Sequence, residues 1–201
     1  MIIFLPECFL NKCFAELLLE ELKVRGKIIH KGFFGGDRIL KELKSVSRRV
    51  YGNEKIILII DIENWRTSRG IYIKNIFKEY DRVDKIHVMI GAEKIGGDRV
   101  IAVIFDPKPE EVFNLDLDES ELKSEDACNK IKKTSKYSEI MNIANQIATL
   151  IRKKIIESTE DPKDLLTSLV VHGTKNIEIE IEELRQVALK EAEAKVKDRW
   201  Q

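Results

Sequence analysis

Acidic residues follow two apolar segments of this 201-residue chain, at the points where the segments end. Asp61 and Glu63 come after five consecutive aliphatic residues at 56–60, and Glu7 follows the apolar run 2–5. An aliphatic run of this kind, mostly β-branched, indicates a central strand that is buried on both faces of a sheet. Open α/β sheets bind ligands and metals at the carboxyl ends of their strands. The three acids are therefore candidates to share one divalent cation.

Other residues could complete such a site. Asp106 ends a further apolar segment, where a fourth acidic ligand would stand. Gly35 and Gly36 precede an expected helix, and backbone N–H groups in such a turn can bind a phosphate. Lys31 lies near this turn and could contact the same phosphate. Asp106 and Lys31 also have ordinary explanations, because Asp-Pro pairs open turns and lysines are common surface charges.

The three acids at the strand ends have explanations that need no ligand. Glu7 falls in the first turn of an expected helix, where the helix dipole favours a negative charge. The segment 61–64 contains residues that are typical of turns and helix caps. Two carboxylates this close repel each other, so one pKa should rise unless a cation neutralises them. A metal site and a capping loop are therefore the two interpretations of this segment.

The spacing of apolar residues predicts the elements that position these groups. Strands are expected at residues 2–5, 27–34, 56–60, 85–90 and 99–105, and helices at 9–24, 38–50 and 70–80. This alternation predicts an α/β fold with a mostly parallel, Rossmann-like sheet flanked by helices. Helical spacing recurs over 138–157, and residues 177–200 favour a final helix. We therefore expect an α/β domain at 1–115 and a mainly helical extension at 116–201, which packs on the domain or mediates association.

The composition of the chain limits the partners and the location that we expect for the protein. The chain has 35 basic and 35 acidic residues, so bulk electrostatics favours neither nucleic acid nor a membrane surface. No stretch approaches the ~18 apolar residues of a membrane-spanning helix. The cysteines Cys8, Cys13 and Cys128 lack the spacing of a zinc site. An odd number of cysteines without a secretory leader indicates reduced thiols and a cytoplasmic location.

The order of these motifs resembles that of the Toprim domain. The counterparts are Phe4-Leu5-Pro6-Glu7-Cys8, Phe34-Gly35-Gly36-Asp37 and Ile59-Ile60-Asp61-Ile62-Glu63-Asn64. The resemblance covers about residues 1–115 and is closest to small Toprim-like proteins related to the overcoming-lysogenization-defect nucleases. Cys8 stands where these proteins usually have Gly, and Glu63 stands where they have a second Asp.

The resemblance implies a nuclease-like protein that depends on Mg²⁺, with Mn²⁺ as a substitute. Glu7 would act as general acid/base or metal ligand, Asp61 and Glu63 would hold the metal, and Asp106 would be a further ligand. The reaction would cleave or transfer a phosphodiester of a nucleic acid or nucleotide. One alternative is a non-catalytic interaction protein that forms a homodimer through its C-terminal helices. Another is a nucleotide-binding module with Gly35 and Gly36 at the phosphate.

Overall fold

The computed structural model describes residues 1–30, 38–50 and 54–158. The chain divides into two compact units, Met1–Leu169 and Val170–Gln201, and every described residue belongs to the first. The predicted helix at 177–200 therefore lies outside the described residues. The predicted strand at 27–34 is described only in its first part.

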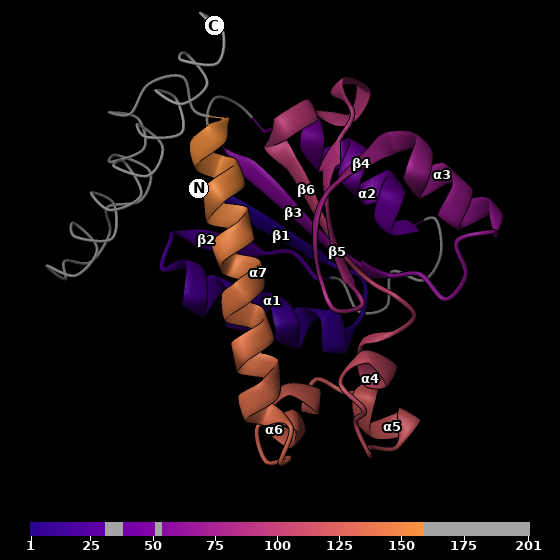
Figure 1. Cartoon of the computed structure of the whole chain (residues 1–201), viewed down its shortest axis with the longest axis vertical. Helices are drawn as coiled ribbons and strands as arrows, with labels where there is room; N and C mark the ends of the chain where they lie inside the picture. The colour runs from indigo at the N-terminus through magenta and orange to yellow at the C-terminus, as the bar shows by residue number, and fades with distance from the viewer. Residues whose placement is uncertain (31–37, 51–53, 159–201) are drawn as a thin grey trace, which may run out of the picture. The chain divides into compact units, whose positions relative to one another are not determined.

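Six strands form a single sheet in the order β2-β1-β3-β6-β5-β4 (Figure 1). The strands are β1 (Ile2–Pro6), β2 (Gly26–Ile28), β3 (Lys55–Asp61), β4 (Phe77–Val83), β5 (Ile86–Gly91) and β6 (Val100–Phe105). Strands β2, β1, β3 and β6 run parallel, and the β4–β5 hairpin is added in antiparallel pairing. The structure confirms the predicted α/β fold with a mostly parallel sheet.

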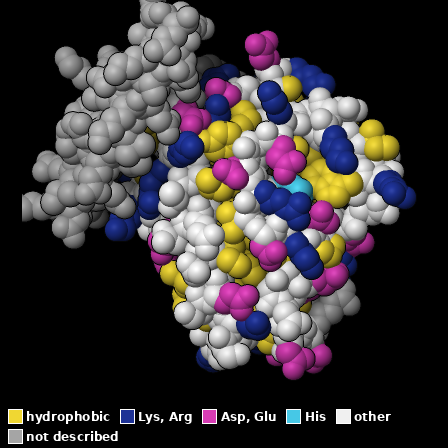
Figure 2. All heavy atoms as spheres, in the orientation of Figure 1, with side chains coloured by type: hydrophobic (Ala, Val, Ile, Leu, Met, Phe, Trp, Pro, Cys, Tyr) yellow, Lys and Arg dark blue, Asp and Glu magenta, His cyan; other side chains and the backbone are white. Residues whose placement is uncertain are grey.

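Helices cover both faces of this sheet. They are α1 (Phe9–Leu22), α2 (Arg38–Ser47), α3 (Ser68–Ile76), α4 (Pro109–Val112), α5 (Glu119–Leu122), α6 (Ala127–Ile131) and α7 (Tyr137–Glu157), with the 3₁₀ helices η1 (Glu93–Ile95) and η2 (Gly97–Arg99). Helices α1 and α7 pack on one face, and α2 and α3 pack on the other. No helix among the described residues is both long and apolar enough to span a lipid bilayer. Figure 2 shows basic and acidic side chains interspersed over the surface, in keeping with a net charge of zero.

Strand β3 is buried on both faces, as its aliphatic run predicts. Ile57 and Ile59 pack with α1 and α7. Ile56, Leu58 and Ile60 pack with α2 and α3. The two sets alternate because successive side chains of a strand point to opposite faces. None of these five side chains is more than 1% exposed, so β3 is the centre of both hydrophobic cores.

The helix predicted at 70–80 is wrong in its second half. Helix α3 ends at Ile76, and Phe77 begins strand β4, which pairs antiparallel with β5. The apolar spacing fits a helix, but pairing with β5 satisfies backbone groups that would otherwise form an open sheet edge. The hairpin returns at Asp84, which has the left-handed φ of 51° that Asp tolerates. The spacing of apolar residues within one segment does not show whether that segment pairs with a neighbouring strand.

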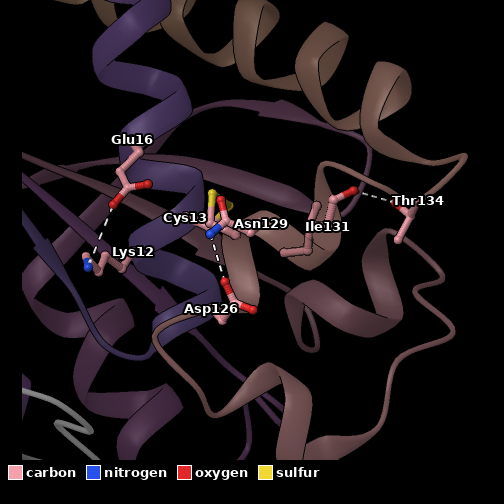
Figure 3. The surroundings of a disulfide bond; sticks show 8 residues. Lys12, Cys13, Glu16, Asp126, Asn129, Ile131 and Thr134 are labelled. Carbon is pink, nitrogen blue, oxygen red and sulfur yellow. Dashed lines mark hydrogen bonds and ion pairs between the residues drawn. A yellow bond between two sulfur atoms is a disulfide. The ribbon is translucent and has the colours of Figure 1, made fainter.

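The expectation of three reduced thiols is also wrong. Cys13 of α1 and Cys128 of α6 form a disulfide, and Cys8 is the free cysteine. Figure 3 shows the bond between these two helices, next to the contact of Asn129 with Asp126. The two cysteines are 115 residues apart, so no local spacing pattern could have paired them. The cytoplasmic location stays a prediction.

The described part of the C-terminal region is helical and shares the core of the sheet. Ile147 and Ile151 of α7 belong to the same buried cluster as Phe14 of α1. A domain boundary after residue 115 stays a prediction. The packing does show that α7 contributes directly to one face of the α/β fold.

Replacing Ile147 with Ala should therefore destabilise the whole fold. Ile147 is 0% exposed, and loss of such a side chain typically costs about 2–5 kcal/mol because a cavity remains. Gln146, the exposed neighbour on the same helix, provides the matched control. Gln146→Ala should change the free energy of unfolding by no more than about 0.5 kcal/mol. Urea denaturation measures both variants, and equal effects would contradict the packing of α7.

The disulfide gives a prediction for thiol titration. Protein that is purified without reductant and then denatured should expose one titratable thiol per chain, because Cys8 is the free cysteine. Prior reduction should expose all three cysteines. Cys8→Ser should show no thiol before reduction. Three thiols in the unreduced wild-type protein would rule out the Cys13–Cys128 bond.

Candidate functional site

Two of the predicted acids meet at the carboxyl ends of β1 and β3. These strands are neighbours, with Pro6 paired to Ile59, so Glu7 and Asp61 leave the sheet side by side. The backbone N–H of Asp61 donates a hydrogen bond to Oε2 of Glu7 at 3.3 Å. Glu7 is only 3% exposed. The structure therefore brings Glu7 and Asp61 together, as the sequence predicts.

Two further residues, which the sequence did not reveal, contact this pair. Nη2 of Arg69 donates to Oε2 of Glu7 at 2.6 Å. Nδ2 of Asn11 donates to Oδ1 of Asp61 at 3.4 Å. Asn11 is 0% exposed, and its Oδ1 has no hydrogen-bond partner among the described residues. We refer to Glu7, Asn11, Asp61 and Arg69 as the carboxylate site.

Neither of these two contacts had a local signal in the sequence. Asn11 lies 50 residues from Asp61. Arg69 is 62 residues from Glu7, and nothing local links the two.

Caps at two helix ends hold the carboxylate site in place. Helix α1 begins after Cys8, whose Sγ accepts a hydrogen bond from the backbone N–H of Asn11 at 3.4 Å. Helix α3 begins after Thr67, whose Oγ1 accepts from the N–H of Gly70 at 3.2 Å. A Cβ atom at residue 70 would lie 2.6 Å from Cα of Trp65, so only glycine fits there. The tight turn fixes where α3 starts, and hence where Arg69 points.

Burial governs the electrostatics of the carboxylate site. Burial raises the pKa of Glu7 to about 7, opposed by the hydrogen bond from Arg69 and reinforced by the charge of Asp61. Burial also raises the pKa of Asp61, again opposed by Arg69. Burial of these adjacent acids therefore raises the affinity of the pair for a proton. Burial raises the pKa of the Cys8 thiol to about 12, so Cys8 is not a thiolate nucleophile.

The other predicted acids make different contacts. Glu63 pairs with Nζ of Lys108 at 2.8 Å and is 65% exposed. Oδ2 of Asp106 accepts a hydrogen bond from the Trp65 indole at 2.7 Å. In the described part of the chain, no group of three or more His, Cys, Asp or Glu side chains is arranged to hold a metal ion. The metal-binding roles of Glu63 and Asp106 stay predictions, and the predicted phosphate contacts Lys31, Gly35 and Gly36 lie outside the described residues.

The carboxylate site nevertheless has oxygen donors that suit Mg²⁺. This ion is usually bound by one or two carboxylates, with water and substrate phosphates completing its octahedral shell. Glu7 and Asp61 supply two carboxylates, and Asn11 presents its Nδ2 to Asp61, so its Oδ1 could serve as a ligand only after rotation of the amide. These residues fit Mg²⁺ or the similar Mn²⁺.

Comparison of the chain with protein-family models, curated proteins and solved structures finds no match. The protein is an α/β protein with a mostly parallel sheet and two adjacent acids, the buried Glu7 and the half-buried Asp61, at the carboxyl ends of two neighbouring parallel strands.

The raised pKa of Glu7 makes stability depend on pH. Because the folded-state pKa of about 7 exceeds the ordinary value of 4.5, the folded state binds more protons between these pH values. The free energy of unfolding should therefore fall as pH rises from about 4.5 to 7, and then level off. Glu7→Gln, which mimics the protonated acid, should lack the contribution of Glu7 to this fall, so its decline should be smaller than that of wild type. At about 1.4 kcal/mol per pKa unit, wild type should lose roughly 2–3 kcal/mol relative to Glu7→Gln between pH 5 and 8.

Urea denaturation across this pH range measures the difference. Glu93→Gln is the matched control, because Glu93 is an exposed acid on η1, at the opposite end of β6 from the carboxylate site. This variant should follow the wild-type pH profile. Parallel profiles for wild type and Glu7→Gln would contradict the raised pKa.

Proposed function

We propose that this protein is a metal-dependent phosphodiester-cleaving or phosphodiester-transferring enzyme that acts on nucleic acid or nucleotides. The observation that carries the proposal is the contact between Glu7 and Asp61 at the ends of adjacent strands. A buried and a half-buried carboxylate side by side favour the binding of a cation. The carboxyl ends of parallel strands are also where α/β sheets present their ligand sites.

Each residue of the carboxylate site has a role in this proposal. Glu7, Asp61 and Asn11 would hold Mg²⁺ or Mn²⁺, and the bound ion would polarise a phosphoryl oxygen and stabilise the charge that develops on it. Glu7, with a pKa of about 7, can give or take a proton at neutral pH as a general acid or base. Arg69 holds the Glu7 carboxylate in place, and a guanidinium at this position suits a phosphate.

The resemblance to Toprim domains supports the same chemistry. In that resemblance Glu7 and Asp61 occupy the positions of the first acid and of the first residue of the Asp-x-Asp motif. Glu63 occupies the position of the second Asp, although its carboxylate contacts Lys108 here. A role for Glu63 therefore requires release of that exposed ion pair, which costs little because exposed pairs are worth only about 0–1 kcal/mol.

A non-catalytic interaction protein is the second candidate, and the Arg69–Glu7 ion pair favours it. Since a guanidinium lies 2.6 Å from Glu7, part of the negative charge is balanced without a metal. In this case the carboxylate site would be a structural feature of the strand ends. Binding of Mn²⁺ separates the two candidates, because only the enzyme requires it.

A nuclease assay tests the proposed function. The full chain is incubated with single- and double-stranded DNA and RNA, with Mg²⁺, with Mn²⁺ or with a chelator. Cleavage should require the metal and fall at least about 100-fold in Asp61→Asn and Glu7→Gln, as expected when a reacting or metal-binding group is removed. Glu93→Gln, purified in the same way, should retain full activity. Cleavage that persists in Asp61→Asn would contradict the proposal.

Thermal unfolding with Mn²⁺ tests the second candidate. An enzyme site should raise the Tm of wild type with increasing Mn²⁺, because an ion that binds only the folded state stabilises it. This shift should vanish in Asp61→Asn. A structural carboxylate pair instead predicts no shift for wild type, and a higher Tm for Asp61→Asn than for wild type because the repulsion with Glu7 is removed.

A further inference from the structure

A groove of about 550 Å³ opens beside the end of β6, and its lining includes no residue of the carboxylate site. Its walls come from the loop after β3, from α3, from the β4–β5 hairpin and from the residue after β6. We call it the Trp65 groove, after a residue of the loop between β3 and α3. Its volume falls within the roughly 300–1,000 Å³ typical of small-molecule sites. Figure 2 shows basic, acidic and apolar side chains gathered around a histidine on one face of the protein.

The two acids of the groove already have donors within it. Oε1 of Glu79 lies 2.8 Å from Nδ1 of His87. Oδ2 of Asp106 accepts from the Trp65 indole at 2.7 Å and lies 3.6 Å from Nε2 of His87. Glu79 is thus paired with His87, and Asp106 with Trp65, while Nε2 of His87 makes no hydrogen bond among the described residues. The acids are therefore poorly suited to capture a positively charged ligand.

The two lysines of the groove are in a different situation. Lys74 lies in the last turn of α3, with its ammonium 5.2 Å from the centroid of the Trp65 ring. Lys78 is the second residue of β4 and is exposed. Within the described part of the chain, neither ammonium belongs to an ion pair. The groove therefore has positive charge available at Lys74 and Lys78, which favours an anionic ligand.

The groove also offers a surface for a planar ring. The Trp65 indole is fixed by its hydrogen bond to Asp106 and by an edge contact with the His87 ring at 5.2 Å. Phe77 and Met89 add apolar surface. Stacking of a base on an aromatic side chain is worth more than an exposed cation–π contact, so a ring can displace the Lys74 ammonium from the indole. The displaced ammonium then remains within reach of an anion attached to that ring.

We propose that the Trp65 groove binds a nucleobase stacked on Trp65, with the attached phosphate held by Lys74 and Lys78. The ligand is either a free mononucleotide or one unit of a nucleic-acid strand, since both present the same base and phosphate. This inference goes beyond the proposed phosphodiester chemistry and does not depend on it. None of the groups that form the groove belongs to the carboxylate site.

Fluorescence of Trp65 tests the groove directly. The chain has two tryptophans, so Trp200→Phe leaves Trp65 as the single emitter. The full chain with this background is titrated with AMP and CMP in the presence of a chelator, which keeps the test separate from metal-dependent cleavage. Saturable quenching is expected. Lys74→Met and Lys78→Met should each raise the Kd at least fivefold, because each keeps an apolar stem but removes the charge that binds phosphate.

Lys94→Met is the matched control. Lys94 is an exposed lysine of η1, which connects the far ends of β5 and β6, and its substitution should leave the Kd unchanged. Adenosine and inorganic phosphate, which each supply half of the ligand, should bind at least tenfold more weakly than AMP. A short single-stranded oligonucleotide separates the two sources: tighter binding than AMP assigns the groove to a strand, and weaker binding assigns it to a free mononucleotide.

Three results would overturn the inference. The first is neither quenching nor retention of AMP, CMP or the oligonucleotide in equilibrium dialysis. The second is binding of adenosine as tight as that of AMP, which would remove the phosphate from the interaction. The third is binding that Lys74→Met and Lys78→Met leave unchanged, which would place the ligand outside the groove. Repeating the titration in Asp61→Asn should give the wild-type Kd, even if that variant has lost every trace of cleavage.

Discussion

The burial of β3 on both faces is the constraint on which the rest of this structure depends. Its aliphatic side chains supply the centre of two cores, so neither the strand's register nor its neighbours can change without exposing one of them. Parallel pairing with β1 on one side then fixes where both strands end. Glu7 and Asp61 therefore meet because the apolar residues that precede them are held in fixed positions. Hydrophobic packing around β3 thus determines where the polar side chains at the carboxyl ends of the strands lie.

The carboxylate site carries an electrostatic cost, because it holds two acidic side chains close together. Placing the buried Glu7 beside the half-buried Asp61 is unfavourable, and the protein reduces this cost with the Arg69 guanidinium and with a raised affinity for a proton. Both arrangements are reversible, since a proton can leave and a guanidinium can turn to a ligand. The proposed metal site depends on this reversibility, because a cation would have to replace these internal partners.

The sequence predicted those features that depend on local pattern. Runs of aliphatic residues and helical spacing located most of the sheet and the long helix α7. The position of Glu7 and Asp61 at the ends of two predicted strands indicated that the two acids lie close together. Features that depend on distant pairing were missed. Cys13 pairs with Cys128, and Arg69 reaches Glu7, so in both cases the partner is set by the assembled fold. Strand β4 was missed for a different reason: its partner β5 follows after only two residues, but the apolar spacing of this segment also fits a helix.

One glycine links two regions of the protein that otherwise share no side chains. Gly70 lies directly after Arg69, and its missing Cβ leaves space for the backbone of Trp65. Any larger residue at this position would push the loop one way and the start of α3 the other. The guanidinium beside Glu7 and the indole beside Asp106 would shift together. In a mutational scan, a single replacement at residue 70 would therefore behave as a double mutant that damages two separate places at once.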